Sequence, residues 1–390
     1  MANDIKTTKL LSSLVRFTKL DRYPRSLILN PRSNDLFSSV VPPRVAPEIK
    51  TVEKNPLVEL FFERVKEMRT ADQIVELYRS EVIPNFQAND RLPFIKAIMK
   101  RAKIFILEEK DLDSALVIWN AVREDQGPVG SPTIVFRSII SVAKELADPT
   151  LPPEGRDIDT ALKVWETACK FDGRFKYRLR VIQSMERTAK DLGFISKDID
   201  AAIKICLDAY KLCSARGHYE HLVNSINEFA ELTALEDFDS AARIWGALFD
   251  LIPNKKEAYL MVQQFANRLV ASELLPAERK PALAVRIWEF LYPRYSDPEK
   301  LVLIKHMMSI ARALSDLGSP RLSWDFNCAI KIWKAVYGFD HSPEQKKIVI
   351  GTMTFVSVRL EDTRRDKDKI DHHYARILRE AINELELNPK

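Results

Sequence analysis

The sequence predicts an all-α protein, a right-handed α-solenoid of about eight helical hairpins that follows an extended N-terminal arm. A short pattern recurs along the chain: two acids separated by a hydrophobic residue, then a small residue and Ala, then an aliphatic residue and usually Trp. Repetition on this scale is typical of repeat proteins, in which neighbouring units share one core. From residue 57 onward, apolar residues recur every three or four positions, which predicts amphipathic helices.

Five copies of the pattern begin at Asp111, Asp157, Asp198, Asp237 and Asp325, the last with Asn327 as its second polar residue. A sixth copy keeps Ala284 and Ile287 but has Lys280-Pro281-Ala282 in place of the acids. The successive Ala anchors are 46, 41, 39, 43 and 45 residues apart. The signature aromatic residues are Trp119, Trp165, Trp245, Trp288 and Trp333. Partial copies at 74–78 and 374–381 suggest atypical outer units, as expected of capping repeats.

Each unit is expected to be a pair of antiparallel helices. The first helices are expected at roughly 94–108, 133–146, 177–192, 219–233, 257–272, 299–315 and 346–360. The second helices are expected to begin at the repeated acids, because the first Asp accepts from free backbone N–H groups and the second favours the helix dipole. The Ala permits close helix packing, and the Trp four residues later is expected to fill the space between units.

Residues 1–56 differ from the rest of the chain and contain six prolines. Residues 1–50 hold nine Lys and Arg against four acids, an excess equal to the net charge of +5 of the whole chain, so the repeat body is formally neutral. The basic, acid-poor stretch at 5–20 is typical of a mitochondrial presequence. A retained arm that wraps around a partner is the alternative.

Composition argues against an enzyme and against a membrane-spanning protein. The chain has only 10 glycines, and it contains no phosphate-binding loop, nucleophile elbow or zinc-protease motif. We therefore predict no catalytic, cofactor or metal residues. No apolar run approaches the length of a membrane span, so any membrane association is expected to be peripheral and through partners.

Several groups of metal-binding residue types have simpler structural explanations. Cys206, Cys213, His218 and His221 lie close in sequence, but their spacing matches no common zinc site. All four cysteines, including Cys169 and Cys328, lie in apolar helical patterns and are expected to be reduced core residues. The pair His372-His373 is expected to belong to a solvated turn.

One cationic stretch is a candidate contact for a polyanion or a partner protein. It consists of Arg174, Lys176, Arg178 and Arg180, interleaved with aromatic residues. Lys96, Lys100, Arg101 and Lys103 would extend it if they faced the same groove. Because the repeat body is formally neutral, a helix start with solvated cations is the favoured interpretation.

The Ala, the aromatic residue four positions later and the small or apolar residue seven positions later resemble the tetratricopeptide-type superfamily over about 57–390. The units of 39–46 residues are longer than the family's repeat, and the Trp-Leu-Gly signature of the first helix is missing. The strict spacing of pentatricopeptide repeats, which would support base-by-base recognition of RNA, is also absent.

A second resemblance concerns residues 57–146. Val82-Ile83-Pro84, the run from Lys110 to Ala115 and the run from Val122 to Pro128 are similar in order and spacing to cytochrome c oxidase subunit Va. That family of helical-hairpin subunits docks on the matrix side of the oxidase and has no catalytic residues. The resemblance implies a mitochondrial accessory subunit.

These observations predict a non-catalytic scaffold that holds other protein subunits in a mitochondrial, respiratory-chain complex, in the matrix or on the matrix side of the inner membrane. The alternative function is an organellar RNA-binding helical-repeat protein, and the alternative location is the cytoplasm. The parts that do not repeat are expected to carry the function: residues 1–56, 174–180 and the loops near 147–157 and 272–281.

Overall fold

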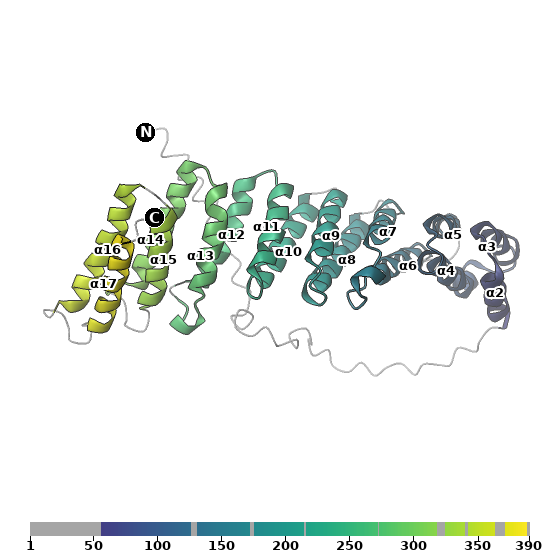
Figure 1. Ribbon diagram of the computed structural model, residues 1–390. Helices are drawn as coiled ribbons and strands as arrows, with labels where there is room; N and C mark the ends of the chain where they lie inside the picture. The colour runs from purple at the N-terminus through teal and green to yellow at the C-terminus, as the bar shows by residue number, and fades with distance from the viewer. Residues whose placement is uncertain are drawn as a thin grey trace, which may run out of the picture. The chain divides into compact units, whose positions relative to one another are not determined.

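The computed structural model describes residues 56–125, 131–171, 175–213, 216–271, 273–317, 324–339, 342–362 and 371–387. The chain divides into two units, Met1–Glu53 and Lys54–Lys390, and every described residue belongs to the second. The basic arm, with the choice between a presequence and a retained segment, therefore lies outside the described residues. Within the described ranges every regular element is helical, which confirms the all-α class (Figure 1).

The helices form successive hairpins, each consisting of a first and a second helix. The first helices are α2 (Pro56–Glu67), α4 (Leu92–Leu107), α6 (Ser131–Leu146), α8 (Phe175–Phe194), α10 (Arg216–Ala234), α12 (Lys255–Leu269), α14 (Asp297–Leu314) and α16 (Pro343–Glu361). The second helices are α3 (Ala71–Leu77, continued by the π-helical turn η2, Tyr78–Val82), α5 (Leu112–Glu124), α7 (Ile158–Phe171), α9 (Ile199–Leu212), α11 (Phe238–Leu251), α13 (Pro281–Leu291), α15 (Phe326–Phe339) and α17 (His372–Leu387). From α4 onward, each first helix packs against the second helix that follows it. Every first helix expected from the sequence overlaps an observed one.

The repeated acids begin the second helices as predicted. In each case a side-chain oxygen of the first Asp accepts a hydrogen bond from the backbone N–H three residues later, which satisfies one of the free donors at the helix start. The acceptors are Asp111, Asp157, Asp198, Asp237, Asp325 and Asp371, and the donor–acceptor distances are 2.9, 2.9, 3.1, 3.2, 2.9 and 3.2 Å.

The second acid of the motif makes a contact that the sequence analysis did not predict. Asp159 accepts from Lys204 of the next unit over 2.6 Å, Asp200 pairs with Arg243, and Asp239 accepts from Arg286 over 2.9 Å. Each cation lies two residues after the Ala of its own copy. These exposed ion pairs form a ladder along the second helices. The copy that has Ala282 in place of the second acid cannot form the corresponding ion pair with the unit that follows it.

The five signature tryptophans are fully buried. The ring of Trp245 on α11 lies 6.1 Å from that of Phe265 on α12 and 6.1 Å from that of Phe290 on α13. Both contacts belong to the following hairpin, so this Trp fills the space between two units. Its Nε1 donates to Oδ1 of Asn227 over 3.2 Å, whereas the other four indole N–H groups have no acceptor among the described residues.

The loops within hairpins are of two main lengths, which explains the uneven repeat. In the short form, the N–H of the capping Asp donates to a carbonyl six residues earlier, as from Asp111 to Phe105 and from Asp198 to Leu192. The residue before the cap, Lys110 or Lys197, then adopts a left-handed conformation. In the long form, the acceptor lies eleven residues earlier: Leu146 for Asp157, Leu269 for Lys280, Leu314 for Asp325 and Leu360 for Asp371.

Buried arginines organise two of the long loops, which the sequence analysis had marked for function. Arg156 donates to the carbonyls of Asp148 and Leu151 and, over 2.9 Å, to the capping carboxylate of Asp198 in the next unit. Arg279 donates in the same way to the carbonyl of Ala271 and to Asp325. A guanidinium with several donors in a rigid fork suits this role. These loops therefore carry a structural link between units.

One glycine is required by close helix packing. A Cβ at Gly193 on α8 would lie 2.3 Å from the ring of Phe229 on α10. The glycine thus lets two successive first helices approach each other. No helix in the described ranges is both long and apolar enough to cross a membrane.

Candidate interaction surface on the first helices

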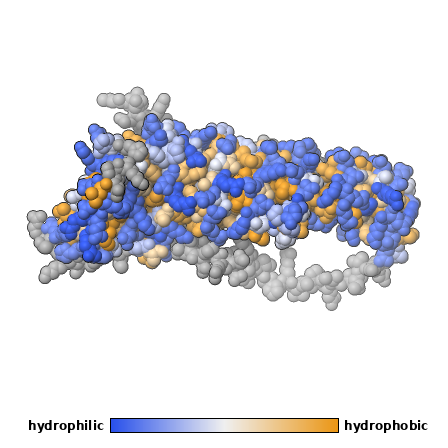
Figure 2. Space-filling view, viewed as in Figure 1, coloured by the Kyte–Doolittle hydropathy of each residue, from blue (hydrophilic) through white to orange (hydrophobic). Residues whose placement is uncertain are grey.

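The exposed sides of the first helices form one surface, here called the first-helix surface. From α4 onward each first helix turns its buried side toward its second helix, and α4, α6, α8, α10 and α12 pack side by side in chain order. Ion pairs between neighbours run across it, from Lys103 to Glu145 over 2.6 Å and from Lys190 to Glu228 over 2.8 Å. The face visible in Figure 2 is largely hydrophilic, with smaller hydrophobic areas between.

Positive charge is concentrated on the first helices of the N-terminal half. Helices α4, α6 and α8 contain eleven Lys and Arg against three acids. Their second helices α5, α7 and α9 contain five Lys and Arg against six acids. Although the repeat body is formally neutral, its positive charge in this half is therefore concentrated on the first helices and not on the second helices.

Five exposed cations define what we call the basic surface: Lys96 on α4, Arg137 and Lys144 on α6, and Arg180 and Arg187 on α8. None of the five forms an ion pair with a described residue. Burial raises the pKa of the nearby Asp191 carboxyl, and the positive charges of Arg187 and Lys144 oppose that rise. Side chains from α6 and α8 therefore lie around the same carboxylate.

The predicted cationic stretch at 174–180 contributes one residue to this surface. Arg174 lies outside the described residues, and so does the side chain of Lys176. Arg178 is half-buried, and its Nε has no acceptor among the described residues. Arg180 is exposed. The neighbouring Tyr177 packs against Phe136 of α6, with ring centroids 4.7 Å apart, so this aromatic side chain belongs to the helix interface.

The four residues of the second cationic group (Lys96, Lys100, Arg101 and Lys103) also differ in their surroundings. Arg101 turns inward and donates to Glu109 over 2.5 Å and to the carbonyl of Met68. Lys103 pairs with Glu145, and Lys100 lies 4.8 Å from the centre of the Phe62 ring. Lys96 remains exposed without an ion pair among the described residues.

Arg137, Lys144 and Arg187 were not predicted from the sequence, although a pattern in it points to them. Cations recur seven residues apart on three successive first helices: Lys96 and Lys103, Arg137 and Lys144, Arg180 and Arg187. A spacing of seven places both residues of each pair on one side of a helix.

Of the four residues with zinc-ligand side chains, Cys206 and His218 are buried, Cys213 is half-buried and His221 is exposed. Oε2 of Glu186 lies 3.1 Å from Nε2 of His221, and burial raises the pKa of this carboxyl. Burial also raises the pKa of Cys206 to about 12 and that of Cys213 to about 11, which keeps both thiols protonated at neutral pH. In the described part of the chain, no group of three or more His, Cys, Asp and Glu is arranged to hold a metal ion.

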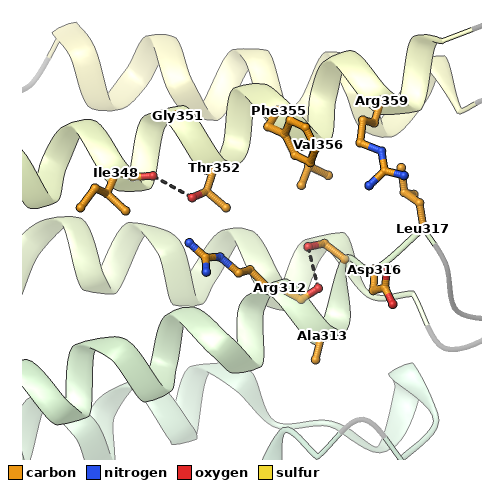
Figure 3. A pocket seen from close by; sticks show the side chains of 11 residues that line it. Arg312, Ala313, Asp316, Leu317, Ile348, Gly351, Thr352, Phe355, Val356 and Arg359 are labelled. Atoms are coloured by element: carbon orange, nitrogen blue, oxygen red, sulfur yellow. Dashed lines mark hydrogen bonds between the residues drawn. The ribbon is translucent and has the colours of Figure 1, made fainter.

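A groove with a volume of about 640 Å³ lies between α14 and α16 (Figure 3). Apolar side chains of α16 line one side, including Ile348 and Phe355, which are 46% and 59% exposed. Arg312 of α14 and Arg359 of α16 extend into the space between the two helices. Among the described residues, neither arginine forms an ion pair. We call this feature the α14–α16 groove.

Comparison with known proteins leaves the chain without an assigned family. No family model matches it, and no curated protein matches it. A similar chain among solved structures comes from a study of the computational design of self-assembling cyclic protein homo-oligomers. It is 14% identical, with 85% of this chain and 97% of that chain covered, but the TM-score is 0.11. A likeness this weak carries no argument about function.

Proposed function

We propose that this protein is a non-catalytic scaffold that binds partner proteins through its first-helix surface. The proposed architecture is a right-handed solenoid of about eight tetratricopeptide-like hairpins. Such arrays present long surfaces for recognition, and they need no catalytic residues to do so. The repeated acids, whose carboxylates could in principle act in acid–base catalysis, serve here as helix caps and inter-unit ion pairs.

The observation that carries this proposal is the apolar character of the exposed side of α16. Ile348, Phe355 and Val358 are 46%, 59% and 62% exposed, although the opposite side of the same helix is packed into the core. Clustered exposed apolar side chains mark interaction sites more often than isolated ones. A partner that covers them would stabilise the complex by removing apolar area from water.

Native gel electrophoresis of an extract from the source organism tests this function. The scaffold is expected to migrate in an assembly much larger than its own mass of 44.9 kDa. Migration of the whole population at the monomer position would overturn the proposal.

We also propose that the assembly is mitochondrial, on the basis of the basic, acid-poor segment at 5–20 and the similarity to oxidase subunit Va. Fractionation tests the location, and the N-terminal sequence of the mature protein separates a cleaved presequence from a retained arm. Co-purification with oxidase subunits would support the respiratory-chain assignment, and exclusive recovery from the cytosol would overturn it.

The basic surface favours a second candidate function, the binding of RNA. Five exposed cations without ion pairs among the described residues would each neutralise a phosphate, so affinity would fall steeply with salt, by a log–log slope of about −3 to −4 for a single strand. The double variant Arg137→Gln/Arg187→Gln should reduce this slope by about 1 to 2. Its matched control is Lys163→Gln/Lys331→Gln, which removes two exposed cations from second helices. Equal slopes for the two double variants, or no salt-dependent binding at all, would exclude RNA binding by this surface.

A further inference from the structure

Helices α4, α6, α8, α10 and α12 pack closely on one another, whereas α14 makes few contacts with the first helix on either side of it. The space between α14 and α16 has a volume of about 640 Å³, and the space between α12 and α14 has a volume of about 170 Å³. The walls of the α14–α16 groove are the last turn of α14 with the following Ser315, Asp316 and Leu317, and the part of α16 from Ile348 to Arg359. The volume of about 640 Å³ is sufficient to hold several side chains of a ligand.

The groove-lining residues of α16 are spaced as the contact residues of a helix–helix interface are. Ile348, Thr352 and Phe355 follow one another at intervals of four and three residues along α16. A second apolar row on α16, formed by Val349, Met353, Val356 and Leu360, is buried in the core, and Val356 also borders the groove. A helix with two apolar rows is expected to be covered on both.

Gly351 lines the groove and leaves open space beside the backbone of α16. A Cβ added at this residue would meet no atom within 4 Å. The neighbouring Thr352 hydroxyl donates to the carbonyl of Ile348 over 2.8 Å, so its polar group is satisfied within α16. Side chains of an occupant can therefore lie against Gly351 without leaving a buried hydroxyl unpaired.

The charges of the groove select among possible occupants. Arg312 and Arg359 extend into it from opposite walls, and neither forms an ion pair with a described acid. The lining also contains one acid, Asp316, so the groove carries two cations against one anion. A guanidinium binds a carboxylate strongly when water is excluded. The chain's own N-terminal segment, with nine cations against four acids in residues 1–50, would place like charges together. Charge complementarity therefore favours an acidic occupant from another protein.

We propose that the α14–α16 groove binds an acidic amphipathic helix of a partner protein. Apolar side chains at positions i, i+4 and i+7 of that helix pack against Ile348 and Phe355, and flanking carboxylates pair with Arg312 and Arg359. This inference rests on the proposed scaffold function and names the chemistry of the partner at this site.

Two synthetic helical peptides test the proposal. Both carry Leu at positions i, i+4 and i+7, and their remaining exposed positions are Glu in one peptide and Lys in the other. Fluorescence anisotropy with the full-length protein should show binding of the Glu peptide at least about tenfold tighter than binding of the Lys peptide. Equal affinities, or no binding of the Glu peptide, would overturn the proposal.

Variants locate the binding. Gly351→Trp fills the groove and should weaken binding of the Glu peptide at least about tenfold. Gly338→Trp on α15 is the matched control, because a Cβ there also meets no atom within 4 Å, and it should leave binding unchanged. The pair Arg312→Glu/Arg359→Glu should reverse the preference between the peptides. Unchanged binding by Gly351→Trp places the peptide elsewhere and contradicts the assignment.

A third peptide, residues 5–20 of this chain, tests the competing occupant. If it binds more tightly than the Glu peptide and loses affinity with Gly351→Trp, the groove belongs to the chain's own segment and the proposal is wrong. Failure of the peptide tests together with a large assembly on native gels would refute this inference alone. Migration of the wild-type protein as a monomer would refute the scaffold function itself.

Discussion

The buried guanidinium of Arg279 donates to Oδ2 of Asp325, 46 residues later, over 3.2 Å. Arg279 closes the loop before one second helix, and Asp325 caps the next second helix. The pair therefore links a loop, a helix start and a neighbouring unit in one contact. Arg156 and Asp198 repeat this arrangement over 2.9 Å in an earlier pair of units.

Removal of this arginine should strongly destabilise the array. Arg279→Met leaves the largely buried carboxylate of Asp325 without this partner and removes the hydrogen bond to the carbonyl of Ala271. We expect a loss of about 3–5 kcal/mol in the free energy of unfolding, measured by urea denaturation. Arg286→Met, which breaks the exposed pair with Asp239, should cost at most about 1 kcal/mol. Equal effects of the two variants would show that burial of the first pair does not matter.

The tryptophans should differ in their dependence on the indole N–H. Trp165→Ala and Trp245→Ala should each cost about 3–5 kcal/mol, because each ring is fully buried. Trp245→Phe should cost about 1–3 kcal/mol more than Trp165→Phe, because it also removes the donor to Asn227. Thermal or urea unfolding of the four variants measures this. If the two Phe variants are equally stable, that hydrogen bond contributes nothing.

Gly193 should tolerate no side chain. Gly193→Ala places a Cβ 2.3 Å from the Phe229 ring and should destabilise the protein by about 1–3 kcal/mol. Gly246→Ala, in the interior of α11 with open space around the added Cβ, should instead stabilise it by up to about 1 kcal/mol. The two unfolding midpoints should therefore move in opposite directions, and a shift in the same direction would contradict the proposed close contact.

Glu299 should contribute stability that depends on pH. Its carboxylate accepts from the Ser296 hydroxyl over 2.6 Å and pairs with Lys256 of α12 over 3.0 Å, and these contacts, the serine first, lower its pKa to about 2. Because the pKa is lower in the folded than in the unfolded state, the contribution is complete above about pH 4.5 and disappears as the pH falls toward 2. Wild type should exceed Glu299→Gln by about 1 kcal/mol at pH 7, with the difference vanishing near pH 2. A constant difference would exclude the carboxylate as its cause.

The helix positions and the capping role of the acids could be predicted from the sequence because they depend on local periodicity and on side chains three residues apart. The links made by Arg156 and Arg279 could not, because their partners lie 42 and 46 residues away and depend on the stacking of units. The loops that contain them were expected to carry function because they vary in length. That variation is explained by the two loop forms, in which the closing backbone hydrogen bond spans either six or eleven residues.

The interaction surface was predicted only in part for a related reason. Net charge averaged over the chain concealed the segregation of cations onto α4, α6 and α8. Of the residues expected to contact a partner, Arg178 is half-buried, whereas Arg187 was not predicted because it lies outside the local cationic run. No pattern in the sequence predicts the α14–α16 groove. It arises from the space between two successive first helices whose first residues, Asp297 and Pro343, are 46 positions apart.

The most direct test of this account is the size of the native assembly formed by three versions of the chain expressed in its source organism. Wild type and Gly338→Trp should migrate together in a large complex, whereas Gly351→Trp should shift toward the monomer mass of 44.9 kDa. This result would show that partners are held on the first-helix surface at the α14–α16 groove. Migration of wild type as a monomer, or identical large complexes for all three versions, would contradict that claim.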